Sequence, residues 1–231
     1  MSQDMTIAAK LIAQTLVWYA LMGLILFVAA GTAAWPAAWV FLGQMILISL
    51  VGGLWLARRD PALIAERLKA PVQQGQPVAD KILTVVLILS FLGGFLLIAL
   101  DAVRFAWSSV PLWAQAFGEL LLLLSLWIGF GTLRENSFAA PVVKIQGDRG
   151  HKVVATGLYR HVRHPLYVGA LTFIAGASLL LGSWWGLSAT LVVAVLLALR
   201  IQIEEKALRA GLQGYDAYAA RVRYRLIPGV W

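Results

Sequence analysis

The amino-acid sequence predicts an all-α, polytopic integral membrane protein, and three observations support this fold class. Of the 231 residues, 61% are hydrophobic and only 13% are charged, whereas a soluble domain is near half apolar and about a quarter charged. Three long runs contain no Asp, Glu, Lys or Arg: residues 11–57, 82–100 and 165–199. The Lys and Arg residues gather in the connections between these runs. Uncharged runs of this length belong in lipid.

The composition also excludes several classes of protein. The chain has no cysteine, which removes thiolate nucleophiles, Cys-ligated zinc and iron–sulfur clusters. A net charge of +8 would suggest nucleic acid as the partner of a soluble protein, but here anionic lipid head groups explain it. We therefore expect membrane lipids as partners, with no nucleic acid and no obligate protein partner.

The apolar runs divide into helices that follow one another along the chain. The first run is too long for one crossing, and the turn GTAAWP at 31–36 divides it in two. Pro111 suits the first turn of a later helix. We expect four full spans, near residues 7–30, 36–57, 80–103 and 111–133.

The last apolar run, 165–199, has a different form. The sequence GSWWG at 182–186 divides it into two short pieces. At a rise of about 1.5 Å per residue, each piece is shorter than a hydrocarbon core of about 30 Å requires. This helical hairpin must therefore tilt, extend through polar residues or stop part-way. Amphipathic helices after the hairpin are expected to form a C-terminal cap.

The distribution of cations predicts the orientation of the chain. Of the 19 Lys and Arg residues, Arg104 alone falls on the side of the predicted spans opposite to the others. Cytoplasmic connections of membrane proteins are enriched in Lys and Arg. We therefore expect both termini, both long connections and any polar chemistry on the cytoplasmic face.

Polar residues cluster on both sides of the hairpin. The first cluster, GLYRHVRHPLYVG at 157–169, holds two of the three histidines, and the second is RIQIEE at 200–205. Each alone could be an anionic-lipid anchor, with Glu204 and Glu205 paired to Lys206 or Arg209. However, the hairpin folds back on itself, so both clusters return to the same membrane face. They should then be neighbours around one hollow.

These motifs resemble a known superfamily. The strings GLYRHVRHPLYVG, the Glu pair and GYDAYAARVRYRLIPG at 214–229 are similar to the signature of the isoprenylcysteine carboxyl methyltransferase and phospholipid methyltransferase superfamily. The first four helices match only in being helices. The resemblance implies an integral membrane enzyme that transfers a methyl group from S-adenosyl-L-methionine, in a cytoplasm-facing pocket, to a lipid-like acceptor. We therefore divide the chain into transmembrane helices, 1–133, and a catalytic region, 134–231.

The resemblance also implies residue roles, carried over by motif position. The cofactor-binding residues would be Gly157, Tyr159, His164, Pro165, Tyr167, Glu204, Glu205, Tyr218, Arg221 and Arg225. The methyl donor carries a carboxylate, an ammonium, ribose hydroxyls and a sulfonium, so its pocket needs both arginines and carboxylates.

The chemistry of the acceptor stays open. A carboxylate acceptor is already ionised at neutral pH and needs no base, so orientation and desolvation suffice, with Arg163 or Arg200 steering it. A lipid amine must lose a proton, for which Glu204, Glu205 or His164 are candidates. The catalytic candidates are thus Arg163, Arg200 and Glu204.

Two other functions stay open as well. A membrane reductase of the sterol reductase type resembles this family in its C-terminal region but binds NADPH, and the Glu pair argues against phosphate groups there. A non-catalytic lipid-binding or transport protein would carry charges along a membrane pathway.

Two isolated features have structural interpretations. Glu119 lies inside a predicted span, where we expect it to pair with Arg104 or with a backbone group. His161 and His164 have the spacing of helical metal ligands, but Pro165 and the lack of a clear third ligand predict no metal site.

Overall fold

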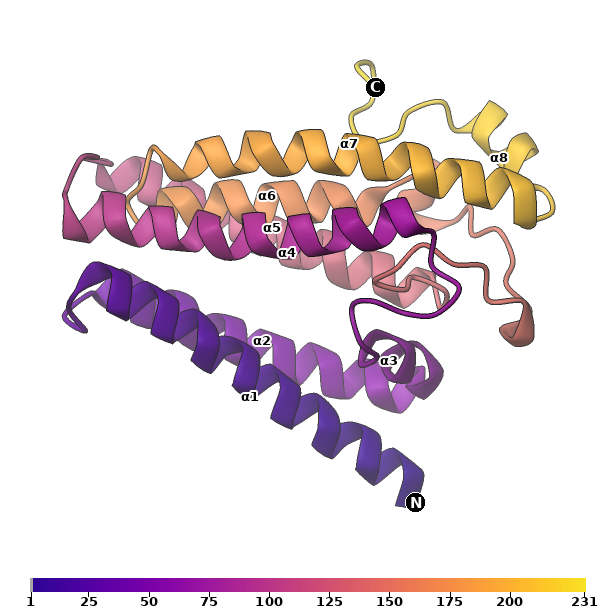
Figure 1. Cartoon of the computed structure of the whole chain (residues 1–231), viewed down its shortest axis with the longest axis horizontal. Coiled ribbons are helices and arrows are strands. Elements are labelled where there is room, and N and C mark those ends of the chain that lie inside the picture. The colour runs from indigo at the N-terminus through magenta and orange to yellow at the C-terminus, as the bar shows by residue number, and fades with distance from the viewer. Residues whose placement is uncertain (1) are drawn as a thin grey trace.

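The computed structural model describes the backbone of residues 2–231 and the side chains of residues 6–231, and in that part the chain is helical without strands (Figure 1). The elements are α1 (Ser2–Ala30), α2 (Pro36–Arg59), α3 (Pro61–Arg67), α4 (Val78–Ala99), η1 (Leu100–Arg104), α5 (Leu112–Glu135), η2 (Gly147–Arg149), η3 (Gly157–Arg160), α6 (Pro165–Leu180), α7 (Gly186–Gly211) and α8 (Tyr215–Arg221). The all-α membrane class is therefore confirmed.

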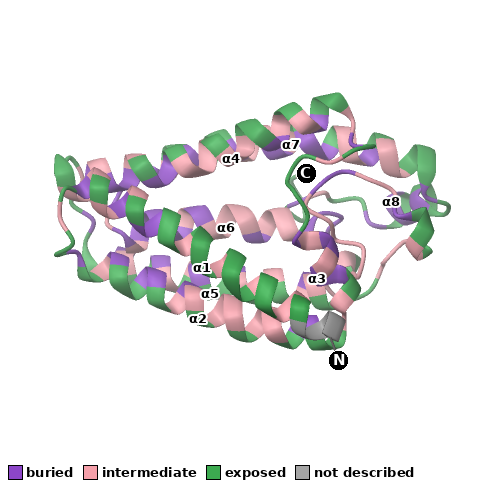
Figure 2. Cartoon of the chain, turned by 60° about the horizontal axis from the view of Figure 1, so that its bottom comes forward, coloured by how far each residue is buried: buried purple, intermediate pink, exposed green. Residues whose placement is uncertain are grey.

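Five helices are long and apolar enough to cross a membrane: α1, α2, α4 with η1, α5 and α7. Large apolar side chains remain exposed on them, such as Leu24 at 60%, Leu89 at 62% and Leu191 at 70%. Figure 2 shows bands of exposed residues on the outward faces of these helices. A bilayer, rather than water, accounts for so much exposed apolar surface.

The two arms of the helical hairpin differ in length, whereas the apolar run divides into two pieces that are both short. α6 is short, with 16 residues, whereas α7 has 26 residues and runs through Arg200, Glu204 and Glu205. The helix expected to follow the hairpin is thus the end of α7. No Pro or Gly interrupts the chain between the apolar run and Gly211, so helical hydrogen bonding propagates. The hairpin extends through polar residues, and five helices rather than four reach spanning length.

Neither α3 nor the π-helical form of η1, at the end of the third predicted span, was predicted. α3 begins at Pro61, and the side chain of Asp60 caps it by accepting a hydrogen bond of 2.9 Å from a backbone N–H, a common start of a helix. η1 is a π-helix at the far end of the bundle. There Asp101 is fully buried and accepts hydrogen bonds of 2.6 Å from Ser108 and 2.5 Å from Ser183.

The helices pack as two groups. Figure 1 shows α4 to α7 running side by side, with α1 and α2 crossing beneath them. α5 packs along α6, where Gly118 and Gly176 face each other: a Cβ on either would lie 2.8 Å from the carbonyl oxygen of the other. Small residues let helices in lipid approach to backbone contact.

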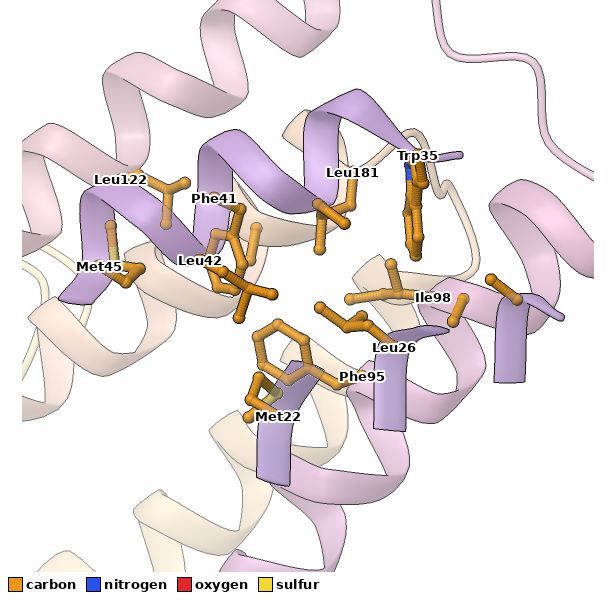
Figure 3. Close-up of a cluster of buried hydrophobic side chains, with 14 residues drawn as sticks. Met22, Leu26, Trp35, Phe41, Leu42, Met45, Phe95, Ile98, Leu122 and Leu181 are labelled. Atoms are coloured by element: carbon orange, nitrogen blue, oxygen red, sulfur yellow. The ribbon is translucent and has the colours of Figure 1, made fainter. Parts of the chain in front are cut away.

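The main apolar core joins these two groups. Met22 of α1, Phe41 of α2 and Phe95 of α4 meet there at 2% exposure or less, together with Leu122 of α5 and Leu181 after α6 (Figure 3). This core lies away from the polar end, so it fixes the helices without occupying the site.

The pairing expected for Glu119 is wrong. Gln44 Nε2 of α2 donates a hydrogen bond of 2.9 Å to Glu119 Oε2. Arg104 instead packs its guanidinium against Gly31, in the turn between α1 and α2. The packing of α2 beside α5 supplies a side-chain amide that the sequence did not indicate.

Candidate functional site

A small cavity of about 110 Å³ lies where α6 begins and α7 ends. Its walls come from the connection after α5, from the start of α6 and from α7 with α8. Among the sequence-predicted residues, it is lined by Tyr159, Arg163, His164, Tyr167, Glu204 and Tyr218. The hairpin therefore brings the two polar clusters together around one hollow, as its geometry predicts.

The C-terminal tail fixes the start of α6. His164 is the N-cap residue and Pro165 opens the helix, where a missing backbone N–H costs nothing. The backbone N–H groups of Arg163 and His164 donate hydrogen bonds of 3.0 Å to the carbonyls of Tyr224 and Arg225. These bonds hold the histidine motif against the tail.

Glu205 is the centre of a buried ion-pair network. Its Oε1 accepts a hydrogen bond of 2.7 Å from Arg163 Nε and lies 3.2 Å from His164 Nε2, and its Oε2 lies 3.2 Å from Arg225 Nη2. Only 4% of Glu205 is exposed. A carboxylate this deeply buried requires such partners. Glu205 and Arg225 do not line the cavity and instead join α6, α7 and the tail.

Glu204 faces the cavity. The hydroxyl of Tyr167 donates a hydrogen bond of 2.7 Å to Glu204 Oε2, and His164 Nδ1 lies 3.6 Å from the same oxygen. The rings of His164 and Tyr167 stack with centroids 5.6 Å apart. Glu204 Oε1 makes no hydrogen bond to a described residue, and 27% of the side chain is exposed. This oxygen is therefore free to accept a hydrogen bond from a ligand.

Tyrosines form the opposite wall. The hydroxyl of Tyr218 donates a hydrogen bond of 2.8 Å to the carbonyl of Tyr159, whose own hydroxyl accepts one of 2.9 Å from Asn136. Tyr215, which the sequence did not single out, also lines the cavity. Burial raises the pKa of Tyr218 to about 12 and raises the pKa of Tyr159 and Tyr215 as well. All three phenols are therefore neutral at physiological pH.

A second, larger cavity of about 1440 Å³ lies between α1 with α2 and the other membrane helices. It is lined mostly by apolar side chains. Ala140, Leu166 and Tyr167 line both cavities and form a common wall between them. Arg200 lines the large cavity rather than the small one: its Nε lies 2.9 Å from Asp80 Oδ1, and its Nη2 donates a hydrogen bond of 2.7 Å to the carbonyl of Pro141.

The remaining predicted residues lie outside the small cavity. Gly157 has φ +55° and packs against Glu135. Pro165 opens α6, and Arg221 is exposed at the end of α8 without an ion-pair partner among the described side chains. None of the three lines the cavity.

The loop at residues 71–77 is anchored by polar contacts. Gln76 is 5% exposed, and its Nε2 donates a hydrogen bond of 2.6 Å to Asp80 Oδ2, which also accepts one of 2.9 Å from Val143 N. Lys144, which lines the small cavity, donates to Gln73 at 2.9 Å. The loop therefore supports the 136–154 connection. An acid in the first turn of an otherwise apolar membrane helix, as Asp80 is, was the available signal, since acids at a membrane need partners.

Comparison with known proteins gives one match. The model of the phospholipid methyltransferase family matches residues 113–213, which include α5, both arms of the hairpin and every predicted residue from Gly157 to Glu205. No curated protein matches the chain. The match to this family, in the integral membrane methyltransferase superfamily, agrees with the resemblance seen in the motifs before residue 213.

Proposed function

We propose that this protein is a membrane methyltransferase that transfers a methyl group from S-adenosyl-L-methionine to a lipophilic acceptor. The observation that carries the proposal is the meeting of a small polar cavity with a large apolar one at Ala140, Leu166 and Tyr167. A charged donor suits the first cavity and a lipid-like acceptor the second. The family match over the hairpin supports the same reaction.

The residues of the small cavity suit the chemistry of the donor. Glu204 Oε1 is available for an ammonium or a ribose hydroxyl. The rings of Tyr159, Tyr215 and Tyr218 offer faces for a purine and for a sulfonium. Lys152 of the 136–154 connection offers a cation for a carboxylate. The side chains of the small cavity therefore suit the charged and aromatic groups of S-adenosyl-L-methionine.

The cavity is smaller than a nucleoside-bearing donor. Its volume of about 110 Å³ holds several water molecules, so binding requires the walls to separate. The α6 and α7 walls are held by the Glu205 network, whereas the 136–154 connection contains only η2 as regular structure. We infer that this connection opens to admit the donor and then packs over the bound donor.

The bound donor supplies an activated methyl group, and the protein orients the acceptor for in-line displacement and excludes water. Arg163 Nε donates a hydrogen bond to Glu205 Oε1, and Arg163 Nη1 donates to the carbonyls of Val222 and Arg223. These bonds hold Arg163 in place, which suits it to position the neighbouring His164. A carboxylate acceptor needs no base. For an amine acceptor, Glu204 is the candidate base, because it alone of the Glu pair lines the small cavity.

The site is proposed to face the cytoplasm. The start of α1, α3, α8 and the C-terminus all lie at the end of the bundle that holds the small cavity (Figure 1). The same end carries nearly all the Lys and Arg residues, which favours the cytoplasmic side.

The test uses the purified protein in lipid nanodiscs. Binding of S-adenosyl-L-methionine and of NADPH is measured by calorimetry, and transfer of a radiolabelled methyl group is measured with fractionated membrane lipids and prenylated thioether acids. We expect donor binding and labelling of a lipophilic product. Affinity for NADPH without affinity for S-adenosyl-L-methionine would reject the proposed function and favour a reductase.

A further inference from the structure

We propose that Arg67 is an anion-binding residue at the polar end of the large cavity, and that it selects a lipophilic acceptor with a carboxylate head group. The inference rests on the proposed function only in treating the large cavity as the acceptor site. Arg67 lies on α3, an element outside the segment that matches the family.

Arg67 is a cation without a counter-charge. It lines the large cavity, and Nη1 donates a hydrogen bond of 2.9 Å to the carbonyl of Ala139. Among the described side chains, no carboxylate forms an ion pair with it, and most of its N–H donors are unused. Burial lowers the pKa of Arg67 below its ordinary value. A bound anion stabilises a buried guanidinium that has no ion-pair partner.

The neighbouring charges are already balanced. Glu66, the residue before Arg67, forms ion pairs with Lys69 and Lys144. Arg200, the other cation of the large cavity, pairs with Asp80 at 2.9 Å. Among the residues that line the large cavity, Arg67 is therefore the cation without a compensating charge.

The position of Arg67 relates it to the reaction. Arg67 donates to the carbonyl of Ala139, and Arg200 donates to that of Pro141. These carbonyls are two residues apart, so they are separated by about 7 Å at most. Ala140, between them, belongs to the common wall of the two cavities. An anion held by Arg67 would therefore lie beside the wall across which the methyl group must pass.

The lining of the large cavity favours a carboxylate over a phospholipid amine. It contains Arg67 and Arg200 and no Asp, Glu or His among the described residues. An ammonium group would find two cations and no carboxylate in this lining, whereas a guanidinium binds a carboxylate through two parallel hydrogen bonds. The apolar walls, with Phe91, Phe130 and Leu197, suit a hydrocarbon tail.

The experiment compares three ligands in nanodiscs: a farnesyl thioether carboxylic acid, its methyl ester and phosphatidylethanolamine. The ester keeps the tail and removes the charge. We expect the wild type to bind the acid at least tenfold more tightly than the ester, the effect of one charged hydrogen bond. Arg67→Gln should abolish this preference, and Arg67→Lys should keep part of it. Arg58→Gln, at an exposed arginine on α2, is the matched control and should behave as wild type.

The outcomes separate the two proposals. An acid preference that persists in Arg67→Gln would overturn the role of Arg67, as would tighter binding of phosphatidylethanolamine than of the acid. Thermal unfolding of the same samples verifies that each variant is folded, and their affinity for S-adenosyl-L-methionine is measured beside it. If the wild type binds the acid through Arg67 but does not bind S-adenosyl-L-methionine, the proposed function fails while the anion site stands.

Discussion

At the scale of single residues, Glu204 and Glu205 show how adjacent identical side chains take different roles. Successive residues of a helix differ by about 100° in direction. Glu205 therefore points into the network with Arg163 and Arg225, while Glu204 points to the cavity and to Tyr167. The Glu205 carboxylate joins α6, α7 and the C-terminal tail, and the Glu204 carboxylate is available to a ligand.

This division predicts that two matched substitutions affect different quantities, ligand binding for Glu204 and stability for Glu205. Glu204→Gln should weaken binding of S-adenosyl-L-methionine about tenfold, since a charged hydrogen bond is lost, with little change in melting temperature. Glu205→Gln should lower the free energy of unfolding by about 3 kcal/mol, because it leaves buried cations unpaired. Calorimetric binding and thermal unfolding in detergent measure both. Equal effects of the two variants on both quantities would contradict the assignment.

The tyrosine wall predicts a pH dependence. The pKa of Tyr218 is raised by burial to about 12, and unfolding returns it to its ordinary value near 10. Between these values the unfolded chain loses the proton first, so stability should fall as pH rises from about 10 to about 12. Absorbance titration of the phenols should show late ionisation. Tyr218→Phe should remove a component near pH 12, and loss of a component near pH 10 instead would show that Tyr218 is solvated.

At the scale of elements, the contact of α5 with α6 positions the predicted site residues, because α6 begins at Pro165, directly after His164. A Cβ on Gly118 would lie 2.6 Å from Leu180 N, whereas a Cβ on Gly129 of the same helix meets nothing within 4 Å. The chain thus offers two glycines of one helix that differ only in their surroundings.

We expect Gly118→Ala to destabilise the protein by about 2 kcal/mol, because overpacking forces α5 and α6 apart. Gly129→Ala should be neutral or slightly stabilising, since alanine favours the helix. Thermal unfolding of both variants in one detergent gives the comparison. Similar melting temperatures of the two variants would mean that α5 and α6 can move apart without loss of stability.

At the scale of the whole molecule, the site is the meeting point of two compartments, one polar and one apolar. The wall between them is shared by a connection and by α6, so movement of the connection changes both. The membrane orientation decides from which side the polar compartment is reached.

Donor binding should therefore protect one part of the chain. We expect S-adenosyl-L-methionine to slow backbone hydrogen exchange in residues 136–154, because these residues close over the bound donor. The turn at residues 31–35, at the opposite end (Figure 1), is the internal control. Identical exchange of 136–154 with and without the donor would contradict closure by this connection.

The orientation can be tested directly because the chain has no cysteine. Asp148→Cys lies in the 136–154 connection and Ala33→Cys in the turn at the far end, and both positions are exposed. A membrane-impermeant thiol reagent applied to intact cells should label Ala33→Cys and spare Asp148→Cys. The reverse pattern would place the site on the opposite side of the membrane.

The sequence by itself determined the class of the fold and the neighbourhood of the site. Charge-free runs identify the membrane helices, and the connectivity of a hairpin obliges His164 and Glu204 to share one end. These are local or covalent constraints, so they can be inferred from the order of residues alone.

Only the tertiary structure decided which side chains meet at that end. The contacts of Arg67 with Ala139 and of Asp80 with Arg200 join residues far apart in sequence, and the direction of each depends on how α3, α4 and α7 pack. The same holds for Gln44 and Glu119. A local pattern can show that a charge needs a partner, as at Asp80, but which side chain becomes that partner follows from the positions of whole helices.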